Sequence, residues 1–153
     1  MKPTKIGLAI ITFTIVAVTT SLAEDTPRWD GQYSWNNTGR ESDYGNVNQS
    51  VSLSVKSADG TIDIGITIRW HAGATIELGA NLKVSDVISQ TDTQGNQMYV
   101  LPFVFQDPFR NRGVGKIVTN GQTATVSLDA TDVVDARASR QYGDYFLTRI
   151  VSP

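Results

Sequence analysis

Any catalytic chemistry in this chain has to use carboxylates and one imidazole, because the sequence holds a single histidine, His71, and no cysteine. A serine or cysteine nucleophile needs a histidine base that a third group holds in place. Asp63 and Glu77 are candidate orienting acids, but no spacing singles them out. We therefore expect His71 to face solvent at a strand end and the protein not to be an enzyme. Hydrolysis by His71 or by a carboxylate pair is the enzymatic alternative.

Metal and cofactor sites are not expected. A zinc site draws on several His or Cys ligands, which this composition does not supply. Asp129, Asp132 and Asp135 place three carboxylates within seven positions, but the glycine that an EF-hand loop needs is missing. Gly113 and Gly115 lie between two predicted strands, so they lack the strand-to-helix context of a phosphate-binding loop. We predict a solvated loop with a helix cap at the aspartates.

The first 23 residues, MKPTKIGLAIITFTIVAVTTSLA, have the layout of a secretory signal peptide. Lys2 and Lys5 form a basic start, an apolar run covers residues 6–18, and Ser21 and Ala23 place small residues at a cleavage site. The run is shorter than the roughly 20 residues that span a bilayer. We expect cleavage after residue 23, no stable membrane insertion afterwards, and a secreted or periplasmic protein.

The remaining residues, 24–153, have the usual size of one domain. With no cysteine to form a disulfide, this domain has to be stabilised by packing and by a hydrogen-bonded sheet. Loss of Lys2 and Lys5 changes the formal net charge from −2 to −4. A mildly acidic chain without a basic cluster does not favour binding to nucleic acid or to an anionic membrane.

The clearest structural pattern is alternation of apolar and polar residues from Ile62 to Trp70. Side chains on a strand point alternately to its two faces, so this segment predicts a strand with one buried face. Val51, Leu53 and Val55 alternate with serines in the same way just before it. Ala58-Asp59-Gly60 separates the two patterns and contains a residue suited to a tight reversal. The two segments predict a β-hairpin.

A second hairpin is predicted around Asn120-Gly121, a strong short-range turn signal. The strands on either side are 114–119 and 123–128, and a short helix with Asp132 as its cap is predicted within 131–139. The other predicted strands are 31–36, 75–78, 81–85, 99–105 and 145–151.

Eight or nine short strands in close succession favour an all-β domain, as a single antiparallel up-and-down barrel. Closure of a barrel removes edge strands, which would be an aggregation hazard for an apolar strand such as 62–70. A β-sandwich is the alternative.

The two ends of this domain carry short motifs, Trp29-Asp30-Gly31-Gln32-Tyr33 and Gly143-Asp144-Tyr145-Phe146-Leu147-Thr148-Arg149. An early W-x-G-x-Y strand and a closing G-x-Y-F-x-x-R strand resemble those of small bacterial calycin-like (lipocalin-like) barrels, and the setting is similar to that of periplasmic lysozyme inhibitors. The resemblance implies that Trp29 on the first strand packs beneath Arg149 on the last and closes the barrel. It also implies a binding role.

Two polar connections are candidate contact surfaces for a partner. The segment 106–113 carries Phe109, Arg110 and Arg112, and the segment 36–46 carries Arg40 and Tyr44. Aromatic residues and arginine are common at interface hot spots. The alternative for Phe109 is that it folds back and plugs one end of the barrel. The sequons at Asn36 and Asn48 matter only in a eukaryotic secretory route.

The leading hypothesis is an exported, non-enzymatic binding protein that contacts another exported or envelope protein, as an inhibitor of a cell-wall-degrading enzyme. A carrier of a small apolar ligand is the first alternative, because small barrels can enclose one ligand. Its cavity would be lined by Trp35, Trp70, Tyr99 and Phe103, although packing in the core is the default for Trp35 and Trp70. A structural or surface-assembly subunit is the second alternative.

Overall fold

A computed structural model of the chain describes residues 27–37, 49–70 and 75–151. The chain is all-β in these ranges, as predicted, and its short helical segments are α1 (Ala136–Ser139) and the 3-10 turn η2 (Val84–Asp86). The strands are β1 (Gly31–Asn37), β2 (Gln49–Ala58), β3 (Thr61–Arg69), β4 (Thr75–Lys83), β5 (Ile88–Thr91), β6 (Gln97–Gln106), β7 (Arg112–Thr119), β8 (Thr123–Asp132) and β9 (Asp144–Arg149).

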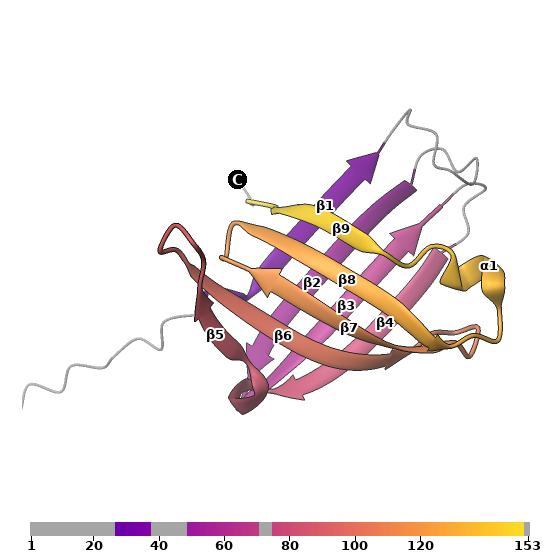
Figure 1. The fold of residues 1–153 in the computed structure, drawn as a ribbon, viewed down its shortest axis with the longest axis horizontal. Coiled ribbons are helices and arrows are strands. Elements are labelled where there is room, and N and C mark those ends of the chain that lie inside the picture. Colours follow the sequence, from indigo (N-terminus) through magenta and orange to yellow (C-terminus); the bar gives the residue numbers. More distant parts are fainter. Residues whose placement is uncertain (1–26, 38–48, 71–74, 152–153) are drawn as a thin grey trace, which may run out of the picture.

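The nine strands form one antiparallel sheet in the order β4-β3-β2-β1-β9-β8-β7-β6-β5. The sheet is strongly curled, so β1–β4 lie behind β6–β9 in Figure 1. The first and last strands are neighbours, with Tyr33 paired to Arg149 and Ser34 to Thr148. The sheet is therefore continuous between its first and last strands.

The prediction of a closed barrel is wrong, because the sheet is open between β4 and β5. The sequence between these strands explains the gap. Residues 85–97 are mostly polar, and all four residues of β5 are exposed. Without an inward apolar stripe, this segment contributes only a short strand that pairs with the first part of β6. The alternative of a β-sandwich does not apply either, because all nine strands belong to one continuous hydrogen-bonded sheet.

The first predicted hairpin is present as β2 and β3. Ile62, Ile64, Ile66 and Ile68 are all buried, in step with the alternation of the sequence. At the turn, Asp59 has φ 51° and Gly60 has φ 77°. Two consecutive left-handed residues are typical of the tight turn that matches the twist of a hairpin. The second predicted hairpin is present as β7 and β8, on either side of Asn120-Gly121.

Three details differ from the sequence expectation. The predicted strands 75–78 and 81–85 are one strand, β4, because Gly79 and Ala80 continue the ladder opposite β3. The strand β5 was not predicted. The helix is shorter than 131–139 and its cap is Asp135, since β8 extends to Asp132. The Asp135 carboxylate accepts hydrogen bonds from the backbone of α1, which Asp132 is too early in the chain to do.

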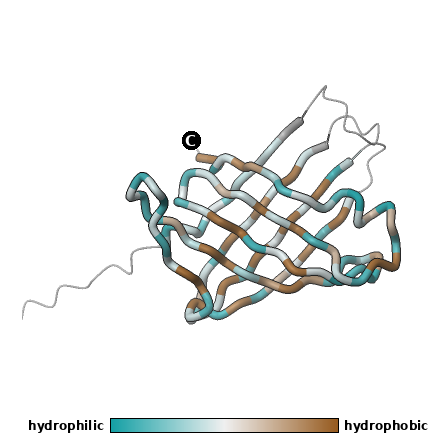
Figure 2. Tube along the Cα trace, viewed as in Figure 1, coloured by the Kyte–Doolittle hydropathy of each residue, from teal (hydrophilic) through white to brown (hydrophobic). Residues whose placement is uncertain are grey.

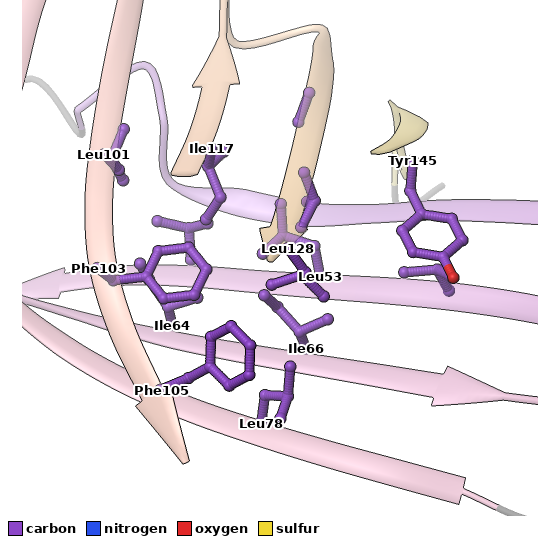
Figure 3. Close-up of a cluster of buried hydrophobic side chains, with 14 of the residues drawn as sticks. Leu53, Ile64, Ile66, Leu78, Leu101, Phe103, Phe105, Ile117, Leu128 and Tyr145 are labelled. Carbon is purple, nitrogen blue, oxygen red and sulfur yellow. The ribbon is translucent and has the colours of Figure 1, made fainter. Parts of the chain in front are cut away.

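The core lies on the concave side of the curled sheet. Along the strands, hydrophobic and hydrophilic residues alternate in Figure 2, as expected for a sheet with one buried face. Phe103 and Phe105 point from β6 toward the facing strands of the curled sheet, where Ile64 and Leu78 lie (Figure 3). No helix within the described residues has the length and hydrophobicity needed to cross a membrane.

Two glycines of β7 make room for these phenylalanine rings. A Cβ atom on Gly115 would lie 2.3 Å from the ring of Phe103, and one on Gly113 would lie 2.4 Å from the ring of Phe105. Each glycine is the cross-strand partner of the phenylalanine that covers it. Gly113 and Gly115 are therefore packing positions inside β7, and the prediction that they lie between two strands is wrong.

Candidate functional site

The hairpin loop between β6 and β7 is built around the buried carboxylate of Asp107. Its Oδ1 accepts hydrogen bonds from the backbone N–H groups of Phe109 and Asn111, both at 2.8 Å. The backbone N–H of Arg110 also donates to the carbonyl of Asp107 at 3.0 Å. Aspartate often organises a turn in this way, by bonding to the backbone that follows it. The loop 107–111 is therefore held by its own first residue.

Asn111 connects this loop to the segment that precedes α1. Its Oδ1 accepts hydrogen bonds from the backbone N–H groups of Val134 and Asp135, both at 2.7 Å. Its Nδ2 donates to Asp107 Oδ2 at 2.8 Å and to the carbonyl of Asp135 at 3.0 Å. Asn111 is fully buried, so each of these bonds replaces water that the amide has lost. The loop and the start of α1 form one hydrogen-bonded unit.

Tyr142 completes this unit from the segment after α1. Its hydroxyl donates to Asp107 Oδ2, and its ring packs edge-on against Phe105 with centroids 5.2 Å apart. Burial and the adjacent Asp107 carboxylate raise the pKa of Tyr142 above its ordinary value of 10.0, because both disfavour the phenolate. We call Asp107, Asn111 and Tyr142 the polar cluster.

The polar cluster presents one arginine to solvent. Arg110 is exposed and has φ 69°, a left-handed conformation that is uncommon for residues other than glycine and asparagine. Arg112, at the start of β7, is also exposed. Phe109 is half-buried and packs against the core, as in the second of the two interpretations of that residue.

More arginines lie beside this loop. The hydrogen bonds of Asn111 place the start of α1 next to it, at the same end of the sheet in Figure 1. Arg137 pairs with Asp135 at 3.0 Å, and this hydrogen-bonded pair lowers the pKa of the Asp135 carboxyl. We call this surface the arginine end; its exposed arginines are Arg110, Arg112, Arg137 and Arg140.

Two of the predicted partner-binding residues, Arg40 and Tyr44, lie outside the described residues, as does His71. Of the two candidate contact segments, the structure therefore describes 106–113 in full and only the first two residues of 36–46.

The four predicted cavity residues are spread along the sheet. Trp35 packs edge-on against Tyr145 with ring centroids 5.6 Å apart, and Tyr99 contacts Trp29 at 5.0 Å. Trp70 is half-buried against the core, and Phe103 is buried over Gly115. All four contact the core, and the described contacts do not bring them around one common space.

The predicted closure pair lies at the junction of β1 and β9. Arg149 donates from one guanidinium nitrogen to the carbonyl of Gly121 at 2.8 Å, and its guanidinium lies against Gly31. Trp29 donates from Nε1 to Ser57 Oγ at 2.9 Å. Trp29 thus links the segment before β1 to β2, and Arg149 links the end of β9 to the β7–β8 turn; the ring contact described for Trp29 is with Tyr99.

The acidic residues considered as metal ligands are not gathered. Among the described residues, no group of three or more His, Cys, Asp or Glu side chains is placed to hold a metal ion. Asp129 and Asp132 lie on β8, whereas Asp135 caps α1.

No protein-family model, curated protein or solved structure matches this chain. The likeness to calycin-like barrels therefore extends only to the all-antiparallel, curled sheet. Functional arguments have to start from the geometry of the site.

Sequence reasoning missed the polar cluster. The turn held by Asp107 did have a local signal, since Asp-Pro at the start of a loop is typical of a tight turn. The contact between Asp107 and Tyr142 joins residues 35 positions apart and left no local pattern.

Proposed function

We propose that this protein is an exported, non-enzymatic inhibitor that inserts its β6–β7 loop into the acidic cleft of a cell-wall-degrading glycosidase. The observation that carries the proposal is the exposed arginine, Arg110, on a loop held by a buried carboxylate. The predicted signal peptide supports an exported location, and the resemblance of the motifs at both ends supports a binding role.

The carboxylates of the target's active site favour an arginine as the residue that contacts them. Most glycosidases cleave their substrate with a pair of carboxylates that flank the bond. A guanidinium binds a carboxylate through two parallel hydrogen bonds and keeps its charge at any physiological pH. Arg110 and its neighbours at the arginine end supply this group in a chain that is acidic as a whole.

The rigidity of the loop favours tight binding. A flexible loop loses conformational entropy when it docks, and this loss weakens the complex. The hydrogen bonds of Asp107 and Asn111 hold the loop in one conformation before it meets a partner. Arg110 is therefore presented on a preformed support.

The test is inhibition of peptidoglycan hydrolysis by a panel of secreted muramidases. We expect the wild type to inhibit at least one of them and Arg110→Gly to raise the inhibition constant about 10- to 100-fold. Glycine suits φ 69°, so this change removes the side chain without straining the loop. Lys56→Ser, which removes a charge from the exposed face of β2, is the control and leaves the inhibition constant unchanged.

The salt dependence supplies a second readout. If Arg110 meets carboxylates, inhibition by the wild type weakens as ionic strength rises, and inhibition by Arg110→Gly weakens less. Full inhibition by Arg110→Gly would assign binding to another surface. Failure of the wild type to inhibit any enzyme of the panel would overturn the proposed function.

A further inference from the structure

The outer face of β7, β8 and β9 carries two matched rows of side chains. The strand registers pair Lys116 with Ser127 and Ser127 with Asp144. They also pair Val118 with Thr125 and Thr125 with Phe146. Cross-strand partners lie side by side on one face of a sheet. Each row therefore has a small hydroxyl residue on β8 and larger side chains on the two outer strands.

The members of these rows point away from the core. Tyr145 and Leu147 are buried, so Phe146 between them faces outward, and it is 71% exposed. Lys116 and Asp144 are exposed and form no ion pair with another described residue. Unpaired charges are ordinary on a surface in contact with water, whereas an exposed aromatic ring aligned with Val118 is an apolar feature typical of interaction surfaces.

A shallow groove runs along the same face. It encloses about 560 Å³ and is lined in part by Pro102, Val114, Lys116, Ser127 and Asp144. On β6, Pro102 and Val104 are exposed while their neighbours Leu101, Phe103 and Phe105 are buried. Strands that are apolar on both faces are typical of sheets covered on both sides. This half of the outer face has the composition of a surface that another molecule covers.

We propose that a second copy of this chain covers it, packed face to face with the two-fold axis along β8. A rotation about this axis leaves each residue at the same height along the strands. It also exchanges the β7 side of the sheet with the β9 side. Lys116 of one copy then faces Asp144 of the second copy, and Val118 faces Phe146. Both contacts occur twice, as the symmetry of an isologous dimer requires.

The charges and sizes favour this occupant over others. An acidic or a basic peptide would neutralise only one of Lys116 and Asp144, and a small apolar ligand would neutralise neither. A second copy pairs both charges and places an apolar partner on Phe146. Ser127 and Thr125 lie at the axis, where their small side chains allow two sheets to approach to about 10 Å.

The test is sedimentation equilibrium of residues 24–153 as a function of concentration. We expect a monomer–dimer equilibrium for the wild type. Lys116→Glu and Asp144→Lys each place like charges opposite one another in both symmetric contacts, so each raises the dissociation constant about tenfold. The double variant restores opposite charges and returns the constant to near the wild-type value. An effect within one copy, on folding, would instead change the free energy of unfolding of each single variant, which urea unfolding measures.

Phe146→Ser tests the apolar row in the same measurement. We expect it to raise the dissociation constant about 100-fold, because two copies of an exposed aromatic anchor are lost per dimer. Val134→Ser is the matched control, since Val134 is 63% exposed but lies between β8 and α1, outside the face of β6 to β9. Circular dichroism of each variant verifies that the sheet is intact.

Two results would overturn the proposal. One is a wild type that stays monomeric up to about 100 µM, because a specific dimer of use to the protein should form below that concentration. The other is a dimer that neither Phe146→Ser nor the charge reversals weaken, which would place the interface elsewhere. Neither result bears on the inhibition assay, since Arg110 lies outside this face.

Discussion

The Asp107 carboxylate accepts hydrogen bonds from three N–H groups and from the Tyr142 hydroxyl. Every buried side-chain nitrogen and oxygen among the described residues has such a partner. A buried carboxylate is tolerated only when its oxygens are paired in this way. At the scale of single residues, Asp107 therefore determines the conformation from which Arg110 reaches solvent.

The raised pKa of Tyr142 predicts a loss of stability at alkaline pH. A group whose pKa is higher in the folded state stabilises the fold fully below its unfolded pKa, here 10.0, and this contribution is lost as pH rises further. The free energy of unfolding of the wild type should therefore fall above pH 10.0. Tyr142→Phe lowers stability at neutral pH, because the hydrogen bond to Asp107 is absent, but shows a smaller decrease above pH 10.0.

Urea unfolding from about pH 8 to about pH 11 measures this difference. Tyr99→Phe is the control, since the Tyr99 hydroxyl forms none of the described hydrogen bonds, and it should keep the wild-type pH dependence. An unchanged pH dependence in Tyr142→Phe would contradict the assignment.

At the scale of elements, the loop is supported by β6 and β7, which pack through matched phenylalanine–glycine pairs. Gly113 and Gly115 accept the rings of Phe105 and Phe103 across the strand pair. An aromatic ring that covers a glycine in a strand supplies the packing that glycine, without a side chain, does not provide. The loop that carries Arg110 begins and ends at these two strands, so their packing determines where the loop points.

Gly115→Ala tests this packing. The added methyl group would overlap the Phe103 ring, and we expect the free energy of unfolding to fall by about 1–3 kcal/mol. Gly79→Ala on β4 is the matched control, because its Cβ would meet no atom within 4 Å. We expect it to change stability by less than about 0.5 kcal/mol. Equal effects of the two changes in urea unfolding would contradict the role of the ring.

At the scale of the whole molecule, the sheet is continuous at the β1–β9 junction and open between β4 and β5. Arg149 lies at this junction and bonds to the carbonyls of Gly121 at 2.8 Å and Arg28 at 3.5 Å. The β1–β9 ladder is short, so side-chain contacts add to its few backbone pairs. Arg149 thus stabilises the junction between the first and last strands.

Arg149→Met keeps a long side chain and removes the guanidinium. We expect the free energy of unfolding to fall by about 1–3 kcal/mol, because the Gly121 carbonyl loses its charged donor. Arg69→Met, on the exposed face of β3, is the control and should change stability by less than about 0.5 kcal/mol. Chemical denaturation followed by tryptophan fluorescence measures both. A loss no greater than that of the control would show that the junction does not depend on Arg149.

The sequence by itself determined the local part of this structure. Strict alternation from Ile62 to Ile68 identified a strand and its buried face, and the turn residues Asp59-Gly60 and Asn120-Gly121 identified two hairpins. These predictions succeeded because period-two patterns and turn conformations depend only on neighbouring residues. The segment 106–113 could also be singled out as a loop with exposed arginines.

Only the tertiary structure decided the remaining features. Whether the sheet closes depends on how strongly it curls and on whether β4 finds a partner strand; the polar composition of residues 85–97 bears on the second, but the curl arises from the packing of the whole sheet. The contact between Asp107 and Tyr142, and the half-burial of Phe109, likewise arise from segments brought together by the fold. The arginine end was visible in the sequence only as a loop of charges. Its rigid support exists because long-range hydrogen bonds hold that loop against α1.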